Sequence, residues 1–489
     1  MTERRPNVLF LFSDEHDPRH MGVSGSALAQ TPNMDRLAQR GTRFVNAYTP
    51  SPICVPARAS LATGLPVHDI CYWDNAIAYD GRVQGWGHAL QAQGHRVESI
   101  GKLHYTDADA PTGFSAQHLA MHIWEGIGQV WGCVRDPLPE QGRADRVMLK
   151  NIGPGWSNYN QFDADVADSA AHWLHERAAS PDDKPWTLFV GMVAPHFPLV
   201  APQEFFDLYP LDAMEHSKLL PADGFAHHPW IARREAFVGE EKHFAGQPER
   251  RMLAIAGYLA LCTFIDQKVG LIIDALEQSG LADDTIVIYS SDHGDNLGQR
   301  GLWGKSNMYL ESSAVPMIVA GAGVPRGAVN YTPVNLVDLH ATFLDAAGVA
   351  DVDDGHERSS KSLLDLLNHS DHERTTLSQY HAIGAPTGAF LLANARWKYH
   401  YYVDYPAELF DLQFDPQETT NLAADPVYAE RIASMYADLV RELGGRTPEQ
   451  VDRMAKDDQN ALVDKFGGPV QAMTEGTPAA TPVPGKGHE

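Results

Sequence analysis

Short apolar runs that alternate with long amphipathic segments are the feature that most constrains the fold of this chain. The runs are rich in β-branched and aromatic side chains and cover residues 7–13, 97–101, 187–194, 285–291 and 315–320. Such runs are typical of strands that are buried on both faces of a sheet. Helical patterns lie between them, for example over 163–177 and 250–280. This alternation predicts an α/β fold with a large, mostly parallel sheet sandwiched by helices.

The alternation ends near residue 370, where the pattern of the chain changes. Three runs are typical of neighbouring antiparallel strands and a helical pattern follows them, over 388–393, 397–403, 408–412 and 426–443. We therefore expect an α/β domain over 1–370 that carries the chemistry, and a small C-terminal α+β subdomain over 371–445. Gly, Pro, Thr and Ala dominate 446–489, which predicts an extended tail ordered by another subunit, in a homodimer or homotetramer.

The charge and composition of the chain exclude several classes of partner. Acidic side chains outnumber basic ones by 63 to 38, and such a surface repels nucleic acid and anionic membranes. An anionic substrate therefore needs positive charge concentrated at its own site. No apolar run reaches the length of about 18 residues that a membrane span requires. The first run is too short for a secretory signal, so we expect a cytoplasmic protein. Four cysteines are too few for a disulfide framework.

Carboxylate and imidazole side chains follow two of the predicted strands, at the point where each strand ends. Asp14 and Glu15 follow the first strand, and Asp292 and His293 follow the strand at 285–291. Ligands bind at the carboxyl ends of the strands in such sheets. Either pair alone is equally compatible with a helix cap or a polar turn. Together they predict a divalent-metal site.

A cysteine lies between two prolines at the start of a predicted helix. The segment reads Ser51-Pro-Ile-Cys54-Val-Pro56-Ala-Arg58. A helix N-terminus presents free N–H groups and a positive dipole to an anion. We expect the helix and Arg58 to lower the pKa of Cys54. A lone cysteine before a helix is more often structural, and these residues alone leave both interpretations open.

Cys54-Val-Pro56-Ala-Arg58 resembles the C-x-P-x-R signature of the sulfatase family, within the alkaline phosphatase superfamily. Further segments follow the family pattern in order over about residues 7 to 425: Gly101-Lys102-Leu-His104, Ala194-Pro-His196-Phe-Pro198, Ser291-Asp292-His293-Gly294-Asp295 with Lys305 and Glu311, and Trp397-Lys398-Tyr399 with 408–411, 415–418 and Asn421. Asp74-Asn75-Ala76 and His293 resemble choline sulfatases and phosphonate monoester hydrolases. The pair of Lys102 and His104 resembles the sulfatases.

This resemblance implies an alkaline phosphatase-like, metal-dependent sulfuric ester hydrolase. A formylglycine-generating maturation enzyme would oxidise Cys54 to formylglycine, whose hydrate would attack a small aryl, alkyl or choline-type sulfate monoester. One divalent ion would be held by Asp14, Glu15, Cys54, Asp292 and His293. Many arylsulfatases have aspartate and asparagine where this chain has Glu15 and His293. The nitrogen ligand shifts the expected ion from Ca²⁺ toward Mn²⁺.

The resemblance also implies roles for individual side chains. The catalytic set would be Cys54, Arg58, Lys102, His104, His196 and Lys305, and the substrate contacts Asn75, Lys102, His196 and Lys305. Arg58 would hold the nucleophile by a charge-assisted hydrogen bond, while the two lysines offset the charge of the sulfate. His196 would protonate the leaving oxygen, alone or with Lys305, and His104 would be the base of the last step.

Two other functions remain open on the sequence. A phosphonate monoester or phosphodiester hydrolase would use the same nucleophile, and cross-reactivity is expected because its substrate resembles a sulfate monoester. An inactive relative that binds sulfated ligands is disfavoured, since a binding protein need not keep the whole catalytic set. A two-metal phosphomonoesterase is disfavoured because a second set of metal ligands is not evident.

Overall fold

A large central sheet organises the molecule, for which a computed structural model describes residues 5–143, 149–180, 184–215, 219–474 and 481–485. Within these ranges eight strands lie in the order β11-β2-β10-β9-β1-β7-β4-β5. They are β1 (Asn7–Asp14), β2 (Gly41–Phe44), β4 (Arg96–Lys102), β5 (Ala116–Met121), β7 (Trp186–Pro195), β9 (Thr285–Ser291), β10 (Met317–Gly321) and β11 (Ala328–Asn330). The strands from β9 to β5 are parallel, and β10 runs antiparallel. The predicted mostly parallel sheet is therefore confirmed.

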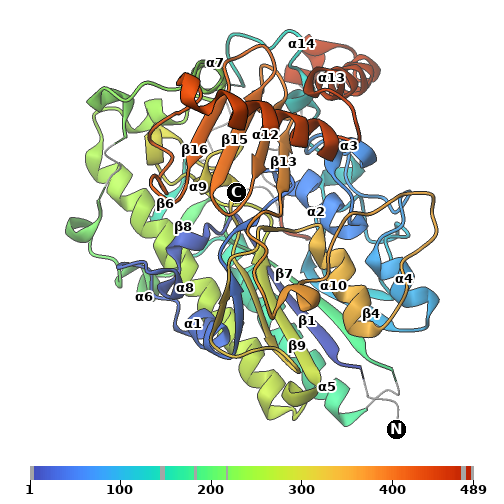
Figure 1. The fold of residues 1–489 in the computed structure, drawn as a ribbon. Coiled ribbons are helices and arrows are strands. Elements are labelled where there is room, and N and C mark those ends of the chain that lie inside the picture. Colours follow the sequence, from blue (N-terminus) through green and yellow to red (C-terminus); the bar gives the residue numbers. More distant parts are fainter. Residues whose placement is uncertain (1–4, 144–148, 181–183, 216–218, 475–480, 486–489) are drawn as a thin grey trace.

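Helices cover both faces of this sheet. Along β1, Leu9 packs in one hydrophobic core with α5 and α8, whereas Phe10 packs in another with α2, α4 and α10. Successive side chains of a strand point to opposite faces, so a strand that is apolar throughout needs cover on both sides. In Figure 1, α8 and α10 lie on opposite sides of the sheet. These helices are α2 (Cys54–Thr63), α4 (Trp86–Ala92), α5 (Asn158–Ala179), α8 (Pro248–Gln278) and α10 (Asp338–Ala347).

A second, antiparallel sheet follows in the chain and lies above the carboxyl ends of the parallel strands (Figure 1). Its order is β13-β14-β15-β16. These strands and the helix packed on them are β13 (Thr376–Tyr380), β14 (Ala389–Ala393), β15 (Trp397–Tyr402), β16 (Glu408–Asp411) and α12 (Ala429–Glu442). The sequence pattern predicted this sheet except for β13, whose Ser378 and Gln379 are polar although buried.

The region after residue 446 differs from the predicted extended tail. Helix α13 (Pro448–Lys465) begins with a capping box between Thr447 and Gln450, and α14 (Pro469–Thr474) follows. Arg135 forms an ion pair with Asp452, so α13 packs on its own chain. The prediction was wrong because Gly, Pro and Thr mark the two ends of this region, while the stretch between them is amphipathic. The homodimer or homotetramer stays a prediction.

Shorter elements complete the described part of the chain. They are β3 (Ala47–Tyr48) with β12 (Val334–Asn335), β6 (Ile152–Pro154) with β8 (Leu199–Ala201), α1 (Pro32–Gln39), α3 (Val67–Ile70), α6 (Gln203–Phe206), α7 (Pro229–Val238), α9 (Leu310–Ser313) and α11 (Leu363–Leu366). Across the described ranges, no helix combines the length and the apolar character that crossing a membrane demands.

Candidate active site

The carboxyl ends of the parallel strands bring most of the predicted site residues together. Asp14 ends β1, and Lys102 ends β4. Glycine allows β4 and β7 to approach closely there, because a Cβ on Gly101 would lie 2.1 Å from the carbonyl oxygen of Gly191. Gly101 also has a φ of 95°, which favours glycine. As a result, Lys102 Nζ lies 2.6 Å from Asp14 Oδ2.

Cys54 is the first residue of α2 and only 2% of its surface is exposed. Pro56 fits the first turn of this helix, where a missing N–H breaks no intrahelical hydrogen bond. The Sγ atom of Cys54 lies 3.3 Å from His293 Nε2 and 3.4 Å from Lys305 Nζ. It also lies 3.7 Å from Asp14 Oδ1. The helix N-terminus and the strand ends therefore meet at this cysteine.

The pKa of Cys54 is raised to about 12, so the expectation of a lowered pKa was wrong. Burial has the largest effect, because the thiolate loses its hydration, and Asp14 and Asp292 act in the same direction. The guanidinium of Arg58 is bound to these same acids. Its Nε lies 2.8 Å from Asp292 Oδ2 and its Nη2 lies 3.0 Å from Asp14 Oδ2. An unmodified thiol here is protonated at neutral pH and is a weak nucleophile.

Four buried side chains around this point can hold a metal ion. One ligand atom from each of Asp14, Cys54, Asp292 and His293 lies within 4.8 Å of the others. Two carboxylates with an imidazole suit a divalent cation of the Mn²⁺ type, and oxygen ligands alone would favour Ca²⁺. The chemistry of this donor set therefore fits the divalent ion that the sequence predicts.

Glu15, the fifth predicted ligand, belongs to a second group with Asp14 and His196. Its Oε2 lies 3.0 Å from Lys305 Nζ and 3.4 Å from His196 Nε2, while its buried Oε1 has no hydrogen-bond partner. Its backbone has a φ of 70°, a strained value for a side chain of this size. Burial raises the pKa of Glu15 well above its usual value. The five predicted ligands thus form two overlapping groups that share Asp14.

Lys305 and His196 are buried beside Glu15, with opposite effects on their pKa values. Burial alone would lower the pKa of Lys305, but the thiolate form of Cys54 together with Glu15 and Asp14 outweighs it and the pKa is raised. The pKa of His196 is lowered well below its usual value by burial and by the charge of Lys305. Lys305 therefore keeps its positive charge, and His196 is neutral in the absence of an added anionic group.

His104 contacts the C-terminal segment, which the sequence did not predict. Its Nε2 lies 2.6 Å from Thr481 Oγ1, and Tyr159 donates a hydrogen bond from its hydroxyl to the carbonyl oxygen of Thr481. Val483, two residues on, is buried in the core that contains α5 and α8. Burial, Lys102 and Arg58 lower the pKa of His104 well below its usual value. No residue pattern in 481–485 distinguishes this segment from a solvent-exposed tail.

The side chain of Asn75 binds the backbone next to Cys54. Its side-chain oxygen accepts a hydrogen bond of 3.0 Å from the N–H of Val55, the residue after Cys54. This oxygen therefore caps the first turn of α2. Because the side-chain oxygen is used in this way, the predicted substrate contact would have to be made by the side-chain nitrogen of Asn75.

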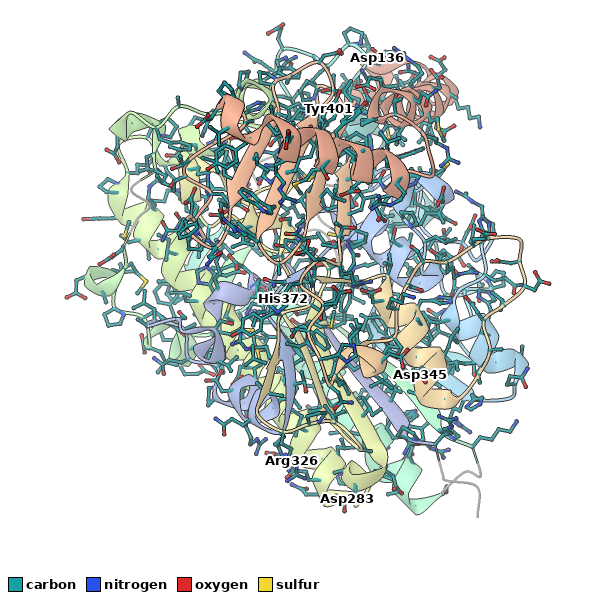
Figure 2. All side chains as sticks on the ribbon, in the orientation of Figure 1. Asp136, Asp283, Arg326, Asp345, His372 and Tyr401 are labelled. Carbon is teal, nitrogen blue, oxygen red and sulfur yellow. The ribbon has the colours of Figure 1, made fainter. Side chains whose placement is uncertain are left out.

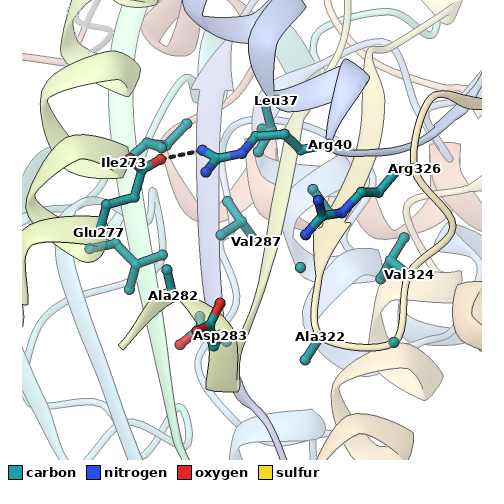
Figure 3. A pocket seen from close by; sticks show the side chains of 15 residues that line it. Leu37, Arg40, Ile273, Glu277, Ala282, Asp283, Val287, Ala322, Val324 and Arg326 are labelled. Carbon is teal, nitrogen blue, oxygen red and sulfur yellow. Dashed lines mark hydrogen bonds and ion pairs between the residues drawn. The ribbon is translucent and has the colours of Figure 1, made fainter. Parts of the chain in front are cut away.

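A separate pocket of about 300 Å³ lies at the opposite end of the sheet. Thr285, the first residue of β9, lines it together with Asp283 and Arg326, and Arg40 pairs there with Glu277 (Figure 3). Figure 2 shows Asp283 and Arg326 far from Tyr401 of the C-terminal sheet. Since Asp292 follows the other end of β9, this pocket takes no part in the cluster around Cys54.

Solved structures of hydrolases share this fold. The chain superposes on a phosphonate monoester hydrolase of Agrobacterium radiobacter with a TM-score of 0.72 and 22% identity, covering 90% of this chain and 96% of that one. A 2-O GAG sulfatase superposes with a TM-score of 0.70 and 21% identity, covering 94% of both chains. These two likenesses show that the chain shares the fold of both solved structures.

Sequence comparison identifies the family. The Sulfatase family model matches residues 6–349, and the model described as N-sulphoglucosamine sulphohydrolase, C-terminal, matches residues 298–443. A choline-sulfatase of Rhizobium meliloti is 32% identical over 441 residues, 87% of this chain and 84% of the relative. Arylsulfatase K of Homo sapiens is 30% identical over 86% of this chain and 79% of the relative. The chain belongs to the sulfatase family and is a hydrolase of sulfate esters.

Proposed function

We propose that this sulfatase cleaves a small organic sulfate monoester, with formylglycine at position 54 as nucleophile and one divalent ion beside it. The observation that carries the proposal is the position of Cys54 Sγ, within 3.7 Å of an imidazole nitrogen, an ammonium nitrogen and a carboxylate oxygen. The similarity to a choline-sulfatase supports a small alkyl ester such as choline sulfate as the substrate.

Asp14, Asp292, His293 and the side chain at position 54 would hold the ion, with Glu15 at the edge of the site. A bound divalent ion lowers the pKa of a coordinated hydroxyl and so supplies a nucleophile near neutral pH. A formylglycine hydrate supplies two hydroxyls on one carbon, so that sulfate can be expelled by breaking a C–O bond. A plain serine or cysteine lacks this second route.

The remaining side chains manage charge and protons. Lys102 and Lys305 lie on either side of Asp14 and offset the charge of a sulfate in a molecule whose net charge is −25. Arg58 holds Asp14 and Asp292 in place by charge-assisted hydrogen bonds. His196 Nε2 faces the cluster. With an anionic sulfate bound, the imidazole would be protonated on both nitrogens; it would give the Nε2 proton to the leaving oxygen and keep the Nδ1 proton. His104 would take the proton when sulfate leaves.

The modification can be tested on the purified protein. The tryptic peptide that contains position 54 should weigh about 18 Da less than the unmodified cysteine peptide, as expected for conversion of a thiol to an aldehyde. The same preparation should hydrolyse choline sulfate or 4-nitrophenyl sulfate. Full activity in a preparation whose peptide carries only the thiol would refute the formylglycine mechanism.

The alternative substrate class is tested in the same assay. The superposition on a phosphonate monoester hydrolase shows a shared fold, whereas the relative with 32% identity is a choline-sulfatase. We therefore expect kcat/KM to be higher for an aryl sulfate than for the matched aryl phosphonate monoester. The reverse ranking would favour a phosphonate monoester hydrolase.

A further inference from the structure

Strand β7 carries two extra residues close to the active site. Phe12 of β1 pairs with Gly191, and Asp14 pairs with Pro195, so two steps along β1 correspond to four along β7. The pairing of β7 with β4 also ends at Gly191. Val193 and Ala194 lie within this stretch, and their N–H groups bond to a side chain outside the sheet. Buried N–H groups need a hydrogen-bond acceptor, and bulges of this kind re-aim side chains next to active sites.

Asp163 of α5 supplies the acceptors for this bulge. Its Oδ1 accepts a hydrogen bond from the N–H of Val193 and its Oδ2 accepts one from the N–H of Ala194, each 2.7 Å long. The side chain is fully buried. Burial raises the pKa of Asp163 to about 7, although both hydrogen bonds lower it. A buried carboxylate on the apolar face of a helix is costly, and the two bulge amides offset part of this cost.

The bulge leads directly to His196. The N–H of His196 donates to the carbonyl oxygen of Val193 at 3.0 Å and closes a turn. The imidazole Nδ1 lies 2.7 Å from the carbonyl oxygen of Phe197, which can only accept, so Nδ1 carries a proton. This leaves Nε2 directed toward Glu15, 3.4 Å from its Oε2. The turn thus fixes the place of the imidazole and keeps the Nδ1 proton hydrogen-bonded to the carbonyl oxygen of Phe197, so Nε2 is the nitrogen whose added proton would pass to the leaving oxygen.

We propose that Asp163 is a positioning residue for His196: by binding both bulge amides, its carboxylate sets where Nε2 of His196 meets the leaving oxygen. The inference rests on the proposed function, because it assumes that His196 protonates the leaving group. The carboxylate of Asp163 bonds to the backbone N–H groups of Val193 and Ala194, so it acts through His196 and is not itself catalytic. Its loss should matter most where proton transfer to the leaving group matters most.

The test compares Asp163→Asn with the wild-type enzyme on two esters. Asparagine keeps one acceptor and turns an NH₂ group toward the second amide, which breaks one hydrogen bond. Since general acid catalysis contributes about 10²–10⁴-fold, we expect kcat/KM to fall about 30-fold for an alkyl sulfate and about 3-fold for 4-nitrophenyl sulfate, whose leaving group needs little protonation. Asp168→Asn, an exposed change on the same helix, is the control and should leave both values unchanged.

A double substitution separates positioning from a general structural role. In a His196→Ala background, Asp163→Asn should cause no further loss on the alkyl sulfate. Equal losses on both esters, or losses that multiply with those of His196→Ala, would overturn the proposal. If Asp163→Asn fails to fold, Asp163→Ser keeps one acceptor with a smaller side chain and is read in the same way.

Failure of the proposed function is visible separately. If the wild-type enzyme hydrolyses phosphonate monoesters instead of sulfates, the same two leaving groups are compared on phosphonates. The role of Asp163 is then still tested by the ratio of the losses in kcat/KM for the two leaving groups. Equal losses there would overturn its role, whatever the substrate class is.

Discussion

Two buried lysines show how differently the strand ends and the C-terminal sheet use charge. Lys305 lies among several acidic groups, and its pKa is raised because Cys54, Glu15 and Asp14 together outweigh burial. Lys398 on β15 is fully buried with its Nζ 2.5 Å from Glu418 Oε1. Burial lowers the pKa of Lys398, and Glu418 offsets this only in part. The pKa of Lys305 is therefore raised and the pKa of Lys398 is lowered, although both lysines are buried.

This difference separates two groups of buried charges. We call the group around Cys54 and Lys305 the reactive cluster, and the pair of Lys398 and Glu418 the anchor. Glu418 also accepts a hydrogen bond of 2.9 Å from the N–H of Leu310, so the pair with Lys398 fastens the C-terminal sheet to the loop after Lys305. At the strand ends, by contrast, the single carboxylate of Asp14 contacts three cations, those of Arg58, Lys102 and Lys305. Overlapping ion pairs that converge on a potential nucleophile are the arrangement that perturbs reactivity, whereas the pair of Lys398 and Glu418 joins two segments of the fold.

Removing the nucleophile should give the largest effect. Cys54→Ala is expected to lower sulfatase activity by at least about 10⁴-fold, because the other groups of a catalytic unit do little without it. The melting temperature should stay close to that of the wild type, as measured by differential scanning calorimetry. Cys71→Ala, at a partly buried cysteine outside the cluster, is the control and should keep full activity.

Breaking the anchor should reduce stability rather than chemistry. Lys398→Met leaves Glu418 buried without its cation, and breaking one partner of a buried pair costs about 3–5 kcal/mol of unfolding free energy. Urea denaturation measures this loss. The kcat of the folded fraction should change little. A large loss of kcat with unchanged stability would erase the distinction between the two clusters.

Neutralising the lysine of the reactive cluster should have the opposite profile. Lys305→Met removes a cation aimed at the developing charge, for which we expect a loss of about 10²–10³-fold in kcat. Steady-state kinetics on 4-nitrophenyl sulfate measures it, and Lys361→Met at an exposed position is the matched control. Kinetic losses as small as those of the control would mean that Lys305 has only a structural role.

Metal binding through the side chains at the strand ends should stabilise the folded protein. A divalent ion at 100 times its Kd stabilises the folded state by about 2.7 kcal/mol, so a chelator should lower the melting temperature of the purified protein. Restoring Mn²⁺ and Ca²⁺ in separate samples shows which ion is preferred. The variant Asp292→Asn should lose this response, whereas Lys398→Met should keep it. A response that survives in Asp292→Asn would place the ion elsewhere.

The smallest expected effect concerns acid stability at α13. Burial alone would raise the pKa of Asp452, but the nearby imidazole of His381 and the charges of Arg135 and Lys456 hold it well below its usual value. A carboxyl with a depressed pKa in the folded state stabilises the protein above its unfolded pKa, near 3.9, and loses this contribution as the pH falls further. Asp452→Asn should therefore flatten the decline of the melting temperature below about pH 4. An unchanged slope would show that other acids control this decline.

The sequence predicted the parts of the site that depend on local patterns. Apolar runs located β1 and β9, so the meeting of Asp14 and Asp292 followed from the rules of parallel sheets. The prolines around Cys54 indicated a helix that opens near Ala57, whereas α2 begins at Cys54. The raised pKa of Cys54 did not follow, because desolvation depends on how completely the surrounding side chains close over the thiol.

Contacts between distant segments were beyond these patterns. Thr481 reaches His104 across 377 residues, and its own segment has no periodicity. Asp163 binds two backbone amides in the stretch where the register of β1 and β7 shifts, and side-chain patterns do not encode such a shift. An acidic residue on the apolar face of α5, beside Phe162 and Val166, was the one available signal for it.

The burial of Cys54 has a consequence for how active protein is made. Only 2% of this residue is exposed, and it lies within a helix among charged groups. On the proposed chemistry, an enzyme that oxidises this side chain must bind it as an open segment, which the folded chain does not offer. If the proposed modification takes place, it would compete with folding. The specific activity of a preparation would then report the fraction of molecules converted at residue 54 before folding, since a molecule that folds first would keep the unreactive thiol.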